Sequence, residues 1–175
     1  SYEDVLKSID DFGRFAGREK EAAAKRAQIE KEYAALTQDV QKGRGPKVLI
    51  IFGSPDSFNM STKKSFGGDL AERLGAVNIA DKAENVKDSS YIPLSMEFVA
   101  KENPDIVMLI TMGGSKEILE KLRANMRDNA IWHDVNAVKN NRVYQLPPSL
   151  FTVNPGTHTI DAMKIMKEYI YGEVK

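Results

Sequence analysis

Side chains that could carry out catalytic or metal chemistry are few in this sequence. It contains no cysteine, which excludes thiolate zinc sites, iron–sulfur clusters, disulfides and cysteine nucleophiles. Its two histidines, His133 and His158, lie far apart with no carboxylate at metal-ligand spacing, so neither a protein metal site nor a catalytic triad is indicated. We interpret His133, beside Trp132 on a polar turn, as a surface residue. For His158, just before the last predicted helix, a helix-capping role and a ligand contact are equally open.

A nucleotide-binding or hydrolase site is equally unsupported. Residues 53–56, Gly-Ser-Pro-Asp, follow a predicted buried strand, where a nucleotide-binding loop would lie. They lack both the spaced glycines of a dinucleotide fingerprint and the Lys-Ser/Thr pair of a phosphate-binding loop. Ser54 has no Gly-x-Ser-x-Gly elbow around it. The sequence therefore predicts a protein that is not an enzyme and holds no cofactor.

Three loops mix apolar and hydrogen-bonding side chains and are expected to hold a ligand without chemistry. Residues 53–67, 112–115 and 147–155 each follow a predicted strand, and ligands of open parallel sheets bind outside the carboxyl ends of strands. Aromatic, thioether and amide groups there suit a bulky, partly apolar ligand. The simpler alternative, favoured for any single phenylalanine, is that its ring tucks under its own loop. The candidate ligand-binding residues are Ser54, Phe58, Met60, Ser65, Phe66, Met112, Phe151, Asn154 and His158.

The elements that must position these loops alternate between strand and helix. Residues 47–53 and 105–111 are continuous apolar runs, typical of strands buried on both faces of a sheet. Shorter strands are predicted at residues 142–146 and 76–79. This alternation predicts an α/β fold, a single three-layer lobe with a mainly parallel sheet between helices. The helical patterns occupy residues 68–74, 95–102, 116–127, 131–138 and 159–171.

The amino-terminal segment has a different pattern. Residues 2–41 are rich in Ala, Glu, Lys, Arg and Gln, without proline, and Gly13 and Gly17 divide the predicted helix into two pieces. The second piece, from Gly17 to Lys42, carries only a narrow apolar stripe and should lie along one edge of the domain, about 39 Å long at ~1.5 Å per residue. Residues 43–46, Gly-Arg-Gly-Pro, end it. A sensory or oligomerisation domain with a coiled coil is the rival class, but this stripe keeps no heptad.

Length and charge narrow the function further. The 175 residues suffice for one globular core, and 25 basic residues balance 25 acidic ones, so nucleic acid is not predicted as a partner. No stretch approaches the ~20 apolar residues needed to span a bilayer. Residues 1–5 contain neither an initiating Met nor the segments of a signal peptide. We therefore expect a mature fragment or an expressed piece of a longer protein.

Several segments in combination resemble a known family. A long helix and the strand KVLII are followed by four further segments: FGGDLAERLGAVNI at residues 66–79, IPLSMEFV at 92–99, NPDIV at 103–107, and Trp132 with AVKNNRVY at 137–144. Together they resemble the carboxyl-terminal lobe of the helical-backbone substrate-binding proteins of ABC importers. This class carries ferric siderophores, haem and cobalamin, and the resemblance covers nearly the whole chain.

The resemblance implies a division of the chain into three parts. Residues 1–16 would be the end of a missing amino-terminal lobe, residues 17–45 the long backbone helix between the lobes, and residues 46–175 the carboxyl-terminal α/β ligand-binding lobe. Since the ligand lies between two lobes in this class, the chain would supply half of the site. Such proteins are held by lipid on the outer face of the cytoplasmic membrane or are free in a periplasm.

Partners are implied in the same way: an iron chelate or related bulky ligand, an ABC permease dimer, and the missing amino-terminal lobe. In the family, a glutamate in a Ser-x-Glu pattern ahead of the Asn-Pro-Asp segment docks into arginines of the permease. Ser95-Met96-Glu97 matches this pattern and nominates Glu97. An exposed glutamate favoured by the helix dipole is the simpler interpretation, and both can hold together.

The expected cargo is an iron complex such as a ferric siderophore or haem, with cobalamin as the alternative. Haem-binding relatives often place a histidine just after the strand that residues 106–111 form here, whereas this sequence has Met112-Gly113-Gly114. Haem therefore requires iron ligation by Met60, Met112 or His158. A siderophore needs no protein ligand to its metal.

Overall fold

Alternate side chains of the central strands enter two separate cores. In the computed structural model, which describes residues 1–84, 86, 88–152 and 156–172, β1 is Lys47–Gly53 and β5 is Ile106–Thr111. Val48 and Ile50 face one layer of helices, Leu49 and Ile51 face the other, and all four are fully buried. Between Lys47 at the start of β1 and Thr111 at the end of β5, these strands are apolar because both faces of the sheet are covered.

The sheet has parallel strands at its centre and an antiparallel extension. Its order is β4-β2-β1-β5-β6, and β3 also pairs with β1. β1 pairs in parallel with β3 and β5, and β5 pairs in parallel with β6, which confirms the predicted fold class. β2 pairs antiparallel with both β1 and β4. The bounds are β2 Phe58–Ser61, β3 Val77–Asn78, β4 Tyr91–Pro93 and β6 Val143–Gln145.

The prediction that residues 53–67 form a solvent-facing loop is wrong. The chain turns back at Ser54, whose backbone N–H donates to Ser57 O at 2.9 Å, and β2 then pairs with β1. In the second half of the segment Met60 and Ser65 are buried, whereas Lys63 and Lys64 are exposed. A short hairpin therefore replaces much of the expected loop.

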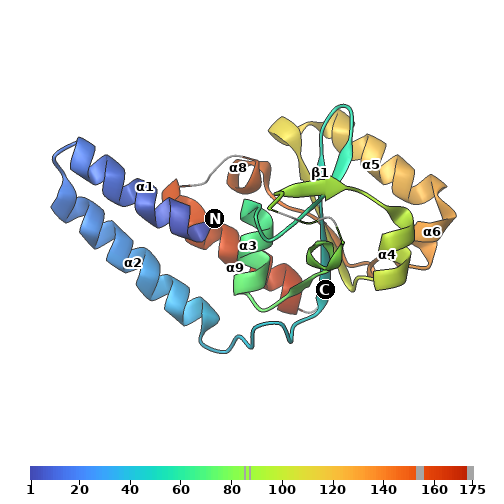
Figure 1. The fold of residues 1–175 in the computed structure, drawn as a ribbon, viewed down its shortest axis with the longest axis horizontal. Helices are drawn as coiled ribbons and strands as arrows, with labels where there is room; N and C mark the ends of the chain where they lie inside the picture. The colour runs from blue at the N-terminus through green and yellow to red at the C-terminus, as the bar shows by residue number, and fades with distance from the viewer. Residues whose placement is uncertain (85, 87, 153–155, 173–175) are drawn as a thin grey trace.

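Helices cover both faces of the sheet (Figure 1). One layer packs on the core around Val48 and Ile50: α1 Tyr2–Phe15, α2 Glu19–Thr37, α3 Phe66–Arg73, α8 Pro148–Phe151 and α9 Thr159–Tyr171. The other packs on the core around Leu49 and Ile51: the 3-10 turn η1 Ile79–Lys82, then α4 Met96–Glu102, α5 Lys116–Asp128, α6 Ala130–His133 and α7 Asn136–Lys139. The short helical turn predicted for residues 131–138 is two short helices, because Val135 between them has an extended backbone with ψ 130°.

The helices α1 and α2 form a hairpin that packs against the lobe (Figure 1). Gly17 at φ 65° ends the first of them, and α2 is shorter than the helix predicted from Gly17 to Lys42. The Tyr2 ring stacks on Tyr33 of α2 at 4.5 Å between centroids, and its backbone N–H donates to Asp69 Oδ2 of α3 at 2.7 Å. These contacts join the hairpin to α3. The assignment of residues 1–16 and 17–45 to a missing lobe and an inter-lobe helix stays a prediction.

Candidate functional site

The carboxyl ends of β1, β5 and β6 meet at one edge of the sheet, which we call the cargo edge. Gly53 and Thr111 are register partners at the ends of β1 and β5. Just after β6, Leu146 N donates to Leu109 O at 2.9 Å. The Thr152 hydroxyl, after α8, donates to Thr111 O at 3.1 Å and ties the third loop to the end of β5. The three loops predicted to bind a ligand therefore begin beside one another.

Aromatic rings gather on the α3 side of the cargo edge. The ring of Phe66, the first residue of α3, lies 6.2 Å from that of Phe151 of α8, centroid to centroid, in a tilted arrangement. The rings of Phe52 and Tyr91 form a second tilted pair at 5.1 Å. Phe151 is only 6% exposed, so its ring is mainly part of the core, as the simpler alternative predicts. Phe58 is partly buried and packs on the opposite core.

Phe52 and Tyr91 were missed as site candidates by the sequence analysis. Phe52 belongs to a strand recognised only for its apolar run, and Tyr91 lies in β4, an edge strand too short to be predicted. The aromatic residue in the Tyr-Ile-Pro run was the available signal. Their proximity depends on strand register, which the sequence alone does not fix.

The predicted hydroxyl groups already bond to the backbone of their own loops. The Ser54 hydroxyl accepts from Ser57 N and donates to Ser57 O, both at 3.2 Å. The Ser65 hydroxyl caps α3 by accepting from Gly68 N at 3.1 Å, and it donates to Thr62 O at 2.7 Å. Both serines shape the loops, and ligand contact by either one stays a prediction.

Met112 and His158 both present donor atoms to solvent, Met112 at the end of β5 and His158 in a turn that contacts α1 and α9. Met112 is 47% exposed and opens η2, Met112–Gly114, which turns at Gly113 with φ 59°. His158 is exposed and ends η3, Gly156–His158, with Nδ1 3.1 Å from Asp161 Oδ2. Asn154 lies outside the described residues. His133 is exposed, with Nε2 3.0 Å from Arg127 O, in agreement with a surface role.

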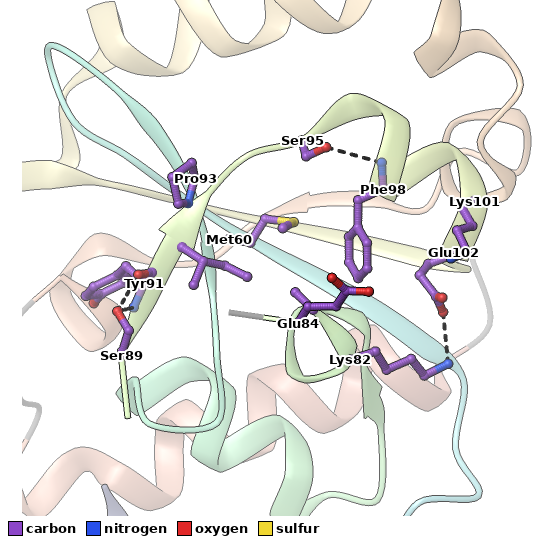
Figure 2. A pocket seen from close by; sticks show the side chains of 12 residues that line it. Met60, Lys82, Glu84, Ser89, Tyr91, Pro93, Ser95, Phe98, Lys101 and Glu102 are labelled. Atoms are coloured by element: carbon purple, nitrogen blue, oxygen red, sulfur yellow. Dashed lines mark hydrogen bonds and ion pairs between the residues drawn. The ribbon is translucent and has the colours of Figure 1, made fainter. Parts of the chain in front are cut away.

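Met60 lies apart from the other candidates. It is 2% exposed, and its side chain enters the core on the α4 side of the sheet. There it forms part of the floor of a pocket of about 590 Å³ between η1, β4 and α4 (Figure 2). Its burial removes it from the cargo edge.

The pocket beside Met60 has an apolar floor and charged walls. Ile92 and Phe98 share the floor with Met60. Lys82 Nζ donates to Glu102 Oε2 at 2.9 Å, and this hydrogen bond lowers the pKa of the Glu102 carboxyl. Partial burial raises the pKa of the Tyr91 phenol. The remaining lining residues are Ala83, Glu84, Ser89, Pro93, Ser95 and Lys101.

Glu97 lies in the first turn of α4 and is exposed. Ser95 is the N-cap, and its hydroxyl accepts from Phe98 N at 3.3 Å. The helix ends at Asn103, which adopts the left-handed conformation at φ 47°. The carboxylate of Glu97 is therefore held near the positive end of a capped helix and faces solvent.

Comparison with known proteins identifies the family. The sequence model described as periplasmic binding protein matches residues 2–150. The chain belongs to this family. Over 176 aligned positions it is 30% identical to the high-affinity heme uptake system protein IsdE of Staphylococcus aureus (strain MRSA252), covering 100% of this chain and 59% of that protein. This periplasmic binding protein chain thus spans about three fifths of that relative's length.

Solved structures of the family share the fold of the chain. The complex of S. aureus IsdE with heme superposes with a TM-score of 0.84 at 30% identity, covering 98% of this chain and 65% of that one. An ABC transporter substrate-binding protein from Listeria monocytogenes EGD-e gives 0.83 at 27% identity, covering 99% and 66%. Among the described residues of this periplasmic binding protein, no helix is both long and apolar enough to cross a bilayer. The same residues contain no cluster of three or more His, Asp or Glu side chains suited to a metal ion.

Proposed function

We propose that the chain is the carboxyl-terminal lobe of the extracytoplasmic substrate-binding component of an ABC importer for an iron complex. The observation that carries this proposal is the similarity across the whole chain to a haem uptake protein, in both sequence and fold. The relatives named above are transport proteins, which accords with a receptor that performs no catalysis. The rival coiled-coil domain is disfavoured because Ile29, the buried residue of α2, packs into the core of the lobe.

Haem is the cargo to test first, with a ferric siderophore second and cobalamin third. Of the three side chains nominated to ligate haem iron, Met60 is buried on the other side of the sheet. Met112 presents an exposed thioether at the end of β5, and thioethers are established axial ligands of haem iron. His158 is exposed and its contact with Asp161 through Nδ1 leaves Nε2 available, but its turn η3 packs against α1 and α9 rather than at the end of β5. Met112 is therefore the stronger candidate.

The partners of the complete receptor belong to the same proposal. A missing amino-terminal lobe would close over the cargo edge, and an ABC permease dimer would receive the cargo through docking contacts that include Glu97. The receptor would lie outside the cytoplasmic membrane, anchored by lipid or free in a periplasm. The exposure of Glu97 in the first turn of α4 supports the docking role.

The identity of the cargo can be tested directly by the colour that a bound ligand gives to the purified receptor. The complete receptor is incubated with haem, a panel of ferric siderophores and cobalamin, and then separated from free ligand by gel filtration. We expect haem or a ferric siderophore to co-elute at one equivalent. The 175-residue chain alone should bind the same ligand far more weakly, because it buries only one side of it. Failure of every iron complex to co-elute would contradict the proposal.

A further inference from the structure

The pocket between η1, β4 and α4 is a concave site separate from the cargo-edge loops. Its volume of about 590 Å³ falls within the ~300–1,000 Å³ typical of sites for small organic ligands. Among the residues nominated for the cargo, Met60 alone lines it. Its other walls come from segments that carry no cargo-edge loop.

Charge is distributed unevenly around the apolar floor of this pocket. Figure 2 shows the Glu84 carboxylate directed toward the Phe98 ring, whereas Lys82 and Lys101 lie on the side of Glu102. Lys82 is neutralised by its ion pair with Glu102. Among the described residues, neither Glu84 nor Lys101 has an ion-pair partner. The pocket thus has one carboxylate and one ammonium group without an ion-pair partner among these residues, around its apolar floor.

The edge of β4 is closed to an added strand. β4 is the outer strand of the sheet, and the Ser89 hydroxyl bonds to both the N–H and the C=O of Tyr91. Pro93 has no N–H to donate. A ligand in the pocket must therefore be held by side chains, which disfavours recognition of an extended chain by strand addition.

We propose that this pocket binds a small zwitterion with an apolar body, of the class of dipeptides with apolar side chains. The ammonium group of the ligand would face Glu84 and the ring of Phe98, since aromatic faces attract cations. Its carboxylate would face Lys101, and its apolar side chains would cover Met60 and Ile92.

A dipeptide fits this charge pattern better than a free amino acid. Glu84 follows η1 and Lys101 belongs to α4, and Figure 2 shows Glu84 below the Phe98 ring and Lys101 further along, beside Glu102. The charges of an amino acid are adjacent on one carbon atom, whereas two residues separate them by up to ~7 Å. The site does not depend on the identity of the cargo, so it can be tested independently of the proposed function.

The test compares three forms of one probe by isothermal titration calorimetry on the full chain. The probes are leucyl-phenylalanine, its N-acetyl derivative, which lacks the ammonium group, and its C-terminal amide, which lacks the carboxylate. We expect Glu84→Gln to weaken binding of the free dipeptide about fivefold, the upper range for a solvated ion pair, and to leave the N-acetyl derivative unchanged. Lys101→Met should weaken the free dipeptide similarly and leave the amide unchanged.

Controls separate a binding site from a general charge effect. Glu19→Gln and Lys116→Met alter exposed side chains that belong to α2 and α5, and both should leave dipeptide binding unchanged. Ala83→Trp fills the pocket from its rim and should abolish binding, while circular dichroism checks that the variant is folded. The proposal is overturned if no binding occurs at millimolar dipeptide or if the capped probes bind as tightly as the free one. Unchanged dipeptide binding by folded Ala83→Trp would also overturn it. A further contrary result is that the unsubstituted chain binds no dipeptide while Ala83→Trp blocks uptake by the complete receptor. That result would assign the pocket to a contact with the transporter.

Discussion

The two ends of the parallel strands differ in how their polar groups are used. At the amino end, Lys47 N donates to Asp105 Oδ2 at 2.9 Å, and Lys47 Nζ donates to Glu102 O at 2.8 Å. At the carboxyl end, Met112 directly follows β5 and faces solvent. The amino end therefore fixes the strands to one another, whereas the carboxyl end leaves side chains available for a ligand. Stability and binding should consequently respond to substitutions at opposite ends of the sheet.

Two glycines with positive φ, one at each end of the parallel strands, allow the packing at the two ends to be compared directly. Gly75, at the amino end, has φ 82°, and a Cβ there would lie 2.9 Å from Gln41 O and 2.8 Å from Val40 Cγ1. Gly113, at the cargo edge, has φ 59°, and no described atom lies within 4 Å of its Cβ position. The backbone conformation is unfavourable for alanine at both sites, but only Gly75 adds a steric conflict with the backbone.

Gly75→Ala should have the largest effect on stability. We expect the free energy of unfolding to fall by about 2–4 kcal/mol, from ~1–2 kcal/mol for the left-handed conformation and the remainder from overpacking. In Gly113→Ala the free energy of unfolding should fall only by the ~1–2 kcal/mol of the left-handed conformation. Urea titration of both variants measures the difference. Equal losses would show that the amino end is no more tightly packed than the cargo edge.

Asp105→Ala should have the next largest effect. Its carboxylate accepts from Lys47 N at 2.9 Å and from Asn136 Nδ2 at 3.4 Å, so its loss leaves a partly buried backbone N–H without a partner. We expect a loss of about 1–3 kcal/mol by urea titration. Ser54→Ala is the control at the cargo edge, where the hydroxyl bonds only within an exposed turn, and it should cost less than about 0.5 kcal/mol. A larger loss in Ser54→Ala than in Asp105→Ala would reverse the comparison.

The predictable parts of the fold are the elements whose burial can be inferred from the residue types at neighbouring positions in the sequence. β1 and β5 were recognisable because both of their faces are buried, which makes residues 48–52 and 106–110 continuous apolar runs. β2 was not, because the run Phe-Asn-Met-Ser mixes polar and apolar residues and becomes a strand only by pairing with β1. The same pairing directs Met60 away from the cargo edge, so its misassignment followed from the missed strand.

The candidate site was predictable in position and less so in detail. The rule that ligands bind at the carboxyl ends of parallel strands located the loop at Met112 without knowledge of any contact. The ring pair of Phe52 and Tyr91 depends on register across β2, and no local pattern reports register. The pocket beside Met60 is formed by segments near Lys82, Tyr91 and Phe98 that are separate in the sequence and meet only in the folded lobe.

Met112→Ala tests the cargo edge with an effect on binding rather than on stability. Because the side chain is exposed, the free energy of unfolding should change by less than about 0.5 kcal/mol. If Met112 ligates haem iron in the complete receptor, haem should dissociate on the order of tenfold faster or more, since even indirect partners of metal ligands contribute ~10–100-fold. His158→Ala removes the other exposed candidate ligand and serves as the comparison, in which haem dissociation should stay unchanged. Unchanged haem spectra and dissociation in Met112→Ala would contradict iron ligation by this residue.

Glu97→Arg should have the smallest effect on the lobe itself and yet impair transport. The side chain is exposed in the first turn of α4, so the folding free energy should stay within about ±0.5 kcal/mol, and cargo affinity should be unchanged because the residue lies outside the cargo-edge loops. Uptake of labelled cargo through the reconstituted importer should fall, since placing like charges together at an interface costs several kcal/mol. Glu117→Arg is the matched control, because Glu117 is an exposed first-turn glutamate of α5 on the same side of the sheet. If both variants transport normally, or if both fail equally, Glu97 is only a solvated glutamate at the start of a helix, and docking must use another part of the surface.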